Sequence, residues 1–191
     1  MSQYAIDGSG NLFDKFGSKI TVTEVASDLV YAKHLVPHVV KFTLPKGNDI
    51  LGIKVIYSSH CWTTQFDQNI HGVSAMIIRD GKRARVFDTN RYQQSSYLPS
   101  IFRDLSSYRV YLTPESRNFG VYSASNVING IAYTAFFTLN KERGRLNAER
   151  HSIVLRVESA YSATQPSKGN KISVAAAVEA ALRGRRLTYR D

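Results

Sequence analysis

The chain has 191 residues, and its apolar content of 43% with 11% aromatic residues excludes a disordered protein and suffices for a buried core. A single cysteine excludes an intramolecular disulfide, and without a secretory signal or an apolar run of about 18 residues we expect a cytoplasmic protein with no membrane partner. The formal net charge of +10 favours a nucleic-acid partner over a basic protein without such a role.

The N-terminal part divides into a lead-in and the beginning of a folded domain. Residues 1–36 carry no periodic pattern that assigns their structure, and residues 37–191 are predicted to form a single α+β domain. Residues 38–44 (HVVKFTL) predict a strand that ends in a turn cluster, and residues 50–59 (ILGIKVIYSS) predict a second strand.

A β-hairpin is predicted next. Residues 73–79 and 84–88 flank the dipeptide Asp-Gly, which tolerates positive φ in tight turns. Lys82 and Arg83 follow the turn at its tip, where their cations are available to phosphate groups, so we expect both to bind nucleic acid.

The segment after this hairpin has the spacing of a helix. Its apolar residues recur at i, i+3, i+4 and i+7: Leu98, Ile101, Phe102 and Leu105. Ser96 is the expected N-cap, and Pro99 falls in the first turn, where its missing N–H is tolerated.

Four more strands and a last helix complete the predicted fold. The strands are expected at residues 109–113, 119–123, 131–139 and 152–161, and the helix at about 171–183. Hairpin connections dominate, so the class is α+β, with a mostly antiparallel sheet of about seven strands and two or three helices.

The connection between the predicted strands 131–139 and 152–161 is strongly basic. A charged loop at residues 140–151 is predicted to join the last two long strands, and Arg143, Arg145 and Arg150 lie in it. Residues 51–167 carry fourteen basic and eight acidic residues, a surplus of six, whereas residues 1–50 are balanced. The loop is therefore a second candidate site for nucleic acid.

The sequence contains no motif that is typical of a metal site or a nucleotide site. The five histidines and one cysteine lack the paired short spacings of a structural zinc site. The sequence contains no P-loop, no dinucleotide-binding glycine motif and no nucleophile elbow. We therefore expect no metal and no cofactor.

The stretch YSSHCWT at residues 57–63 is the strongest candidate for chemistry. If the strand continues through it, His60 and Cys61 point to opposite faces, and Cys61 is expected to pack in the core. His60 and His71 would share one sheet end if strands 53–60 and 73–79 were antiparallel neighbours.

Arginine side chains and hydroxyl groups can be placed near the same end of the predicted sheet as His60 and His71. Arg85 and Arg91 flank a Phe-Asp pair, and guanidinium groups bind phosphate through two parallel hydrogen bonds. On the last long strand, the apolar face of Ile153, Leu155 and Val157 is expected to continue into Ser159 and Tyr161.

This layout resembles the barnase/RelE-like ribonuclease toxins: an antiparallel sheet with basic hairpins, His and Arg at one sheet end, and a late strand ending in Ser-Ala-Tyr. The resemblance implies metal-independent RNA cleavage. Such cleavage needs a base, an acid and cations on the phosphorane. His60 and His71 could be base and acid, Arg85 and Arg91 the cations, and Ser159 or Tyr161 a positioning donor.

Three hypotheses follow. The first is a metal-independent ribonuclease or toxin-like effector, which would be a hydrolase with a possible protein partner or inhibitor. The second is a non-catalytic nucleic-acid-binding or regulatory protein that uses the same basic hairpins. The third is a cysteine-dependent hydrolase or transferase with Cys61 as the nucleophile, which requires an exposed thiol with a lowered pKa.

Overall fold

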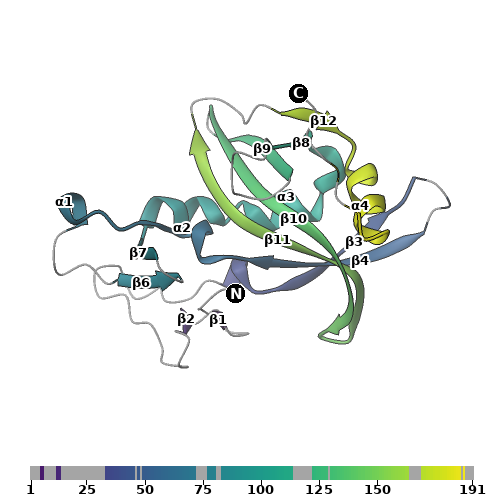
Figure 1. The fold of residues 1–191 in the computed structure, drawn as a ribbon, viewed down its shortest axis with the longest axis horizontal. Helices are drawn as coiled ribbons and strands as arrows, with labels where there is room; N and C mark the ends of the chain where they lie inside the picture. Colours follow the sequence, from purple (N-terminus) through teal and green to yellow (C-terminus); the bar gives the residue numbers. More distant parts are fainter. Residues whose placement is uncertain are drawn as a thin grey trace.

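The protein is built around one mixed sheet, seen in a computed structural model (Figure 1). The structure describes residues 33–45, 47, 49–71, 77–80, 83–113, 122–128, 130–163, 169–185 and 187, together with the short strands β1 (Ala5–Ile6) and β2 (Leu12–Phe13). The seven strands of the main sheet follow the order β12-β8-β9-β10-β11-β4-β3.

The strands of the main sheet are β3 (His38–Thr43), β4 (Ile50–Tyr57), β8 (Val110–Leu112), β9 (Tyr122–Ile128), β10 (Ile131–Leu146), β11 (Glu149–Ala163) and β12 (Asn170–Ile172). All neighbours pair antiparallel except β11 and β4, which run parallel from Ile53↔Ile153 onwards. The predicted α+β class and the mostly antiparallel sheet are confirmed.

A second, three-stranded sheet holds the predicted hairpin. Its order is β5 (Thr63–Gln65), β7 (Arg83–Phe87), β6 (Ile77–Asp80), with Asp80 paired to Arg83 next to the turn. The condition under which His60 and His71 would share a sheet end, namely that this hairpin is the antiparallel neighbour of β4, is not met, because β3 and β11 occupy the two edges of β4.

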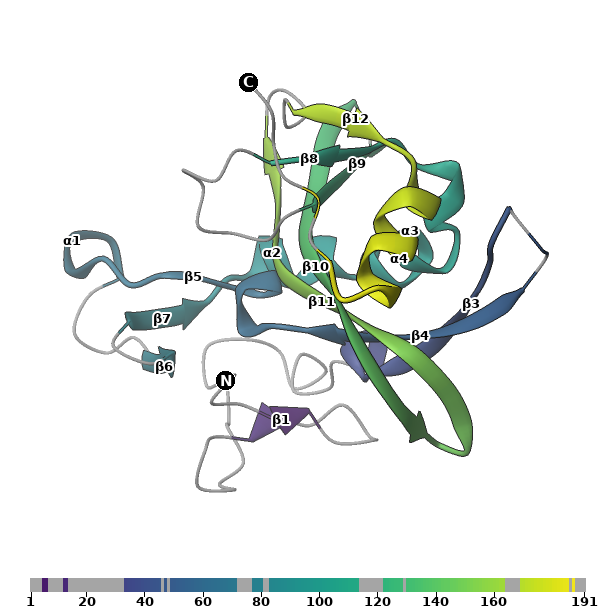
Figure 2. The same ribbon diagram turned by 45° about the vertical axis from the view of Figure 1, so that its right-hand side comes forward.

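The β10–β11 hairpin is a long two-stranded ribbon that projects beyond the body of the protein (Figure 2). The predicted charged loop at residues 140–151 is wrong: the strands continue to Leu146 and from Glu149, and the turn is Asn147-Ala148, both with positive φ. The outer ribbon, residues 140–150, exposes its side chains on both faces, apart from the half-buried Leu146. The sequence there therefore shows no apolar alternation.

The helices are α1 (Gln68–His71), α2 (Thr89–Ser95), α3 (Leu98–Arg103) and α4 (Val174–Leu182). The predicted apolar stripe from Leu98 to Leu105 is buried, which confirms the helix there. Ser96, however, ends α2 and does not cap α3. The N-cap that forms is Asp88, whose carboxylate accepts the Arg91 N–H at the start of α2.

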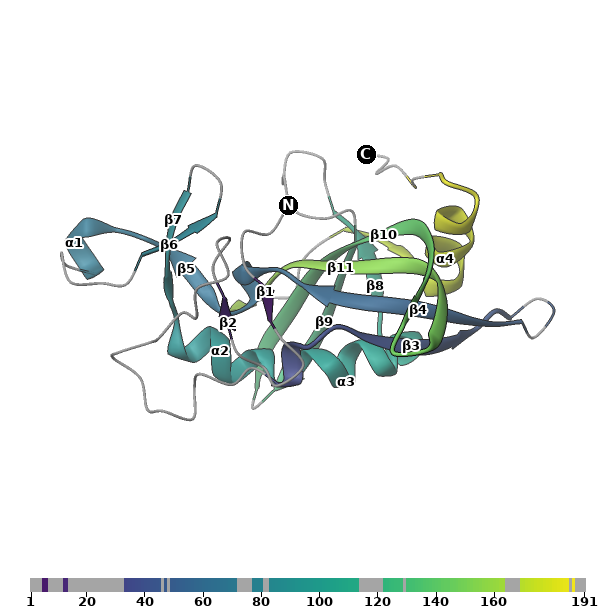
Figure 3. The same ribbon diagram turned by 90° about the horizontal axis from the view of Figure 1, so that it is seen from below.

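One core lies between the main sheet and the helices α3 and α4. It joins Ile53 and Val55 of β4, Leu155 and Val157 of β11, and residues of both helices. Figure 3 shows α2 and α3 following one another along the sheet. Within the predicted lead-in, the 3-10 helix Lys33–Leu35 contributes Leu35 to this core. Among the described residues, no helix is long and apolar enough to cross a membrane.

A β-bulge in β11 changes which side chains face the core. Phe137 pairs with Val157 and Phe136 pairs with Ser159, so Glu158 is an extra residue on this strand. The alternation therefore inverts after Val157, and Ser159 and Tyr161 lie on the face opposite to the core residues before them. The predicted continuation of one face from Ile153 to Tyr161 is wrong for this reason.

Candidate functional site

The site is built on the turn that follows β4. Ser58 is tied to the bulge of β11: its N–H donates to the Val157 carbonyl at 2.9 Å and its hydroxyl to the Glu158 carbonyl at 2.6 Å. The Ser58 hydroxyl also accepts the His60 N–H at 3.2 Å, so it caps the 3-10 helix Ser59–Cys61. The prediction that His60 and Cys61 alternate along a strand is therefore wrong, since the strand ends at Tyr57.

Cys61 and Trp62 are core residues, with exposed fractions of 0% and 1%. The Cys61 thiol donates to the Val157 carbonyl at 3.9 Å. Burial raises the pKa of this thiol to about 12. A nucleophilic cysteine needs an exposed thiolate, so this geometry favours the packing role expected for Cys61 and opposes the cysteine-enzyme hypothesis.

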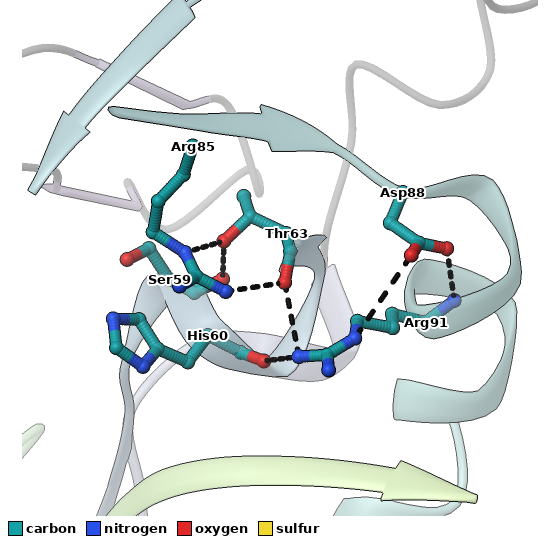
Figure 4. A network of polar contacts seen from close by, with 6 residues as sticks. All are labelled: Ser59, His60, Thr63, Arg85, Asp88 and Arg91. Carbon is teal, nitrogen blue, oxygen red and sulfur yellow. Dashed lines mark hydrogen bonds and ion pairs between the residues drawn. The ribbon is translucent and has the colours of Figure 1, made fainter. Parts of the chain in front are cut away.

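Thr63 is the centre of a polar network (Figure 4). Its hydroxyl donates to the Ser59 carbonyl and accepts from Arg85 Nε, both at 2.7 Å. Its carbonyl accepts from Arg85 Nη2 at 2.7 Å and from Arg91 Nη1 at 3.0 Å. One buried threonine thus joins two guanidinium groups from different elements, β7 and α2.

Arg91 extends this network towards β11. Its Nη1 also donates to the His60 carbonyl at 3.0 Å, and its Nε lies 3.9 Å from Asp88 Oδ2. Its guanidinium carbon stands 5.6 Å from the centroid of the Tyr161 ring, within cation–π range. The structure therefore brings together the side chains of three predicted residues, Arg85, Arg91 and Tyr161, with the main chain of His60, whose imidazole ring points away from Arg91 (Figure 4).

Arg85, Arg91, His60 and Tyr161 differ in solvent exposure, which decides whether a ligand can contact them. Arg85 is 7% exposed and bonds to Thr63, so it holds the turn in place. The Arg91 side chain is 24% exposed, and His60 and Tyr161 are half-buried. The accessible part of the site is therefore an arginine, a histidine and a tyrosine at the edge of the network.

The other predicted catalytic residues are not joined to this network by the described contacts. Ser159 is buried and lies two residues before Tyr161 on the same face. His71 ends α1, but its side chain lies outside the described residues. The same holds for the side chain of Arg83 and for Lys82 as a whole.

The outer ribbon presents a second cluster, made of Arg143, Arg145 and Arg150, all exposed. Arg145 and Arg150 are directly paired across the two strands, and Arg143 lies two residues before Arg145, at an irregularity in the register between Lys141 and Gly144. Like charges placed opposite each other on a sheet are unfavourable. The stability of the fold therefore does not account for this arrangement.

The acidic residues of the ribbon are neutralised by lysines of other strands. Glu149 lies 3.4 Å from Lys41 of β3, and Glu142 lies 3.5 Å from Lys54 of β4. Within the part of the chain that the structure describes, none of the three arginines has an ion pair. The ribbon arginines (Arg143, Arg145 and Arg150) thus remain as an uncompensated positive cluster.

The sequence patterns did not single out Thr63, Ser58 or Asp88. Asp88 carried a readable signal, because an aspartate before a run of helix-compatible residues is a common N-cap. Thr63 carried none, since its role depends on Arg85 and Arg91 arriving from other elements. Among the described residues, no group of three or more His, Cys, Asp or Glu side chains could hold a metal ion.

Comparison with known proteins gives one match. The family model described as the YjaZ family matches residues 20–182. No curated protein and no solved structure matches the chain.

Proposed function

This chain belongs to the YjaZ family, and we propose that it binds nucleic acid, with RNA favoured, through the ribbon arginines. The observation that carries the proposal is the exposed, uncompensated pair of Arg145 and Arg150 with Arg143 beside them. Phosphate groups supply the negative charge that this cluster lacks within the described chain.

The shape of the ribbon supports the same proposal. A two-stranded ribbon is narrow enough to enter the major groove of B-form DNA, whereas RNA would meet it through single strands or loops, because the major groove of A-form RNA is deep and narrow. The ribbon stands away from the core, so a ligand can reach the arginines without contact with α3 or α4 (Figure 2). The net charge of +10 adds a long-range attraction for any polyanion.

The test compares two triple variants of equal net charge. One is Arg143→Gln/Arg145→Gln/Arg150→Gln; the control is Arg109→Gln/Lys171→Gln/Arg185→Gln, which removes three exposed cations outside the ribbon. Binding of a single-stranded RNA, a duplex RNA and a duplex DNA is measured by fluorescence anisotropy over a salt series. For the preferred ligand, the slope of log affinity against log salt should fall by about two to three in the ribbon variant.

The control variant should keep most of the wild-type slope. An equal loss in both variants would mean that only net charge matters, and the ribbon would lose its assigned role. Absence of binding to all three nucleic acids at low salt would contradict the proposal as a whole.

Metal-independent RNA cleavage is the second candidate, and the placement of the Arg91 guanidinium beside the Tyr161 ring and the main chain of His60 favours it. The assay is RNA cleavage in excess EDTA. If His60 is the general base, His60→Ala should reduce the rate by about 10²–10⁴-fold, and His71→Ala likewise if His71 is the acid. Circular dichroism checks that each variant is folded. Wild-type protein that binds RNA and leaves it intact would leave binding alone as the function.

A further inference from the structure

The strand β3 (His38–Thr43) is an edge strand of the main sheet. It pairs with β4 on one side, and within the described ranges no strand pairs with it on the other. In an antiparallel strand, alternate residues turn their N–H and C=O groups away from the neighbour. The outer edge of β3 therefore presents a row of donors and acceptors to which another strand can pair.

A cavity of about 170 Å³ opens beside this edge. Four consecutive residues of β3, 40–43, line it, together with Ile53 of β4 and Leu155 of β11. The cavity therefore lies over the core face of the sheet, between the sheet and α3, and extends to the edge strand β3. Its inner wall is apolar and consists of Phe42, Ile53, Phe102 and Leu155.

The rim of the cavity is positively charged. Arg103, the last residue of α3, lines the cavity together with Ser106. Arg103 is exposed, and among the described residues it has no ion pair. Lys41 is the second cation, but Glu149 already lies 3.4 Å from its Nζ. Arg103 is thus the cation available to a ligand at this rim.

We propose that the groove between β3 and α3 binds an extended peptide as an additional strand. One apolar side chain of the peptide fills the cavity, and an acidic residue two positions away, on the same face, meets Arg103. The edge of β3 supplies the main-chain hydrogen bonds, and the cavity selects the side chain, which is the general mode of strand addition. This site is separate from the ribbon arginines and does not depend on nucleic-acid binding.

The probe is a panel of acetyl-Glu-Val-X-Val-Glu-amide peptides, with Val, Leu, Ile, Phe or Met at X. Backbone amide NMR of the full chain follows each titration. At least one peptide should give saturable shifts in residues 39–43 and 102–106. Replacing both glutamates by lysine should weaken that binding by at least about tenfold, because like charge then faces Arg103.

N-methylation tests whether the peptide is added as a strand. An added strand uses the N–H groups of alternate residues only. Methylation of both valine nitrogens and methylation of the X and final glutamate nitrogens should therefore differ: one modification abolishes binding, and the other leaves it. Equal tolerance of both would overturn strand addition.

Protein variants locate the site. Arg103→Glu should weaken binding by at least about tenfold, whereas Arg109→Glu, a matched change at another exposed arginine, should leave it unchanged. Shifts confined to other residues, or no saturable shift with any peptide, would overturn the proposal. So would a dimer, seen by light scattering, whose β3 amides are protected without peptide, because a second copy would then occupy the edge.

Discussion

Among single residues, Thr63 joins three others in the polar network: Ser59, Arg85 and Arg91. It is fully buried, and its hydroxyl links the Ser59 carbonyl to the Arg85 guanidinium. Thr63→Val keeps the shape and removes both hydrogen bonds, one of them to a charged group. We expect the free energy of unfolding to fall by about 2–4 kcal/mol, measured by urea denaturation.

The neighbouring residue provides the control for this change. Thr64 is half-buried and points to the other face of β5. Thr64→Val should change stability by less than about 1 kcal/mol. If the two variants are equally stable, the Thr63 hydroxyl does not support the network.

Cys61 gives a prediction on alkaline stability. Its pKa is raised from an ordinary 9.0 to about 12 in the folded protein, so only the unfolded chain releases this proton between these values. Below pH 9 the thiol is neutral in both the folded and the unfolded protein. As the pH rises from 9 towards 12, ionisation of the thiol stabilises only the unfolded chain, so the folded state loses stability. The free energy of unfolding of the wild type should therefore fall by up to about 1.4 kcal/mol per pH unit above pH 9.

The Cys61→Ala variant isolates this effect. Burial also raises the pKa of Tyr57 and Tyr133, whose ordinary value is 10.0, so their effect begins about one unit higher. Between pH 9 and 10 the variant should show a flatter dependence than the wild type in urea denaturation. Parallel curves would mean that the thiol titrates normally. RNA binding at pH 7 should be unchanged by this substitution.

For the elements, the contact of β4 with the ribbon at Arg150 and His151 depends on Gly52. A Cβ at this position would lie 2.0 Å from the Arg150 carbonyl oxygen and 3.1 Å from the His151 Cα. Both are main-chain atoms, which cannot turn aside, so Gly52→Ala must separate β4 from β11. We expect a loss of more than about 3 kcal/mol in urea denaturation.

Gly144, on the ribbon itself, gives the comparison. A Cβ there would lie 2.9 and 3.0 Å from two atoms of the His151 ring, a buried side chain that can shift more easily than main-chain atoms. Gly144→Ala should therefore cost about 1–3 kcal/mol, less than Gly52→Ala. A larger loss of unfolding free energy from Gly144→Ala than from Gly52→Ala would show that the ribbon is more closely packed at Gly144 than β4 is against β11 at Gly52.

For the whole molecule, the patterns that could be predicted from the sequence are local ones. The stripe of Leu98, Ile101 and Phe102 and the hairpin of β6 and β7 depend on residues close in the chain, and both are confirmed. The bulge at Glu158 has no local signal, because it appears only in the pairing with β10. The polar network likewise depends on three elements meeting at Thr63.

The parallel pairing of β4 with β11 sets the order in which the molecule can form. Ile53 pairs with Ile153, 100 residues later in the chain (153 minus 53), so this contact closes a long loop and is slow to form. During synthesis at about 5–20 residues per second, β4 waits about 5–20 s for its neighbour. Over that interval Ile53 and Val55 have no β11 to cover them, and the nascent chain is most exposed to aggregation.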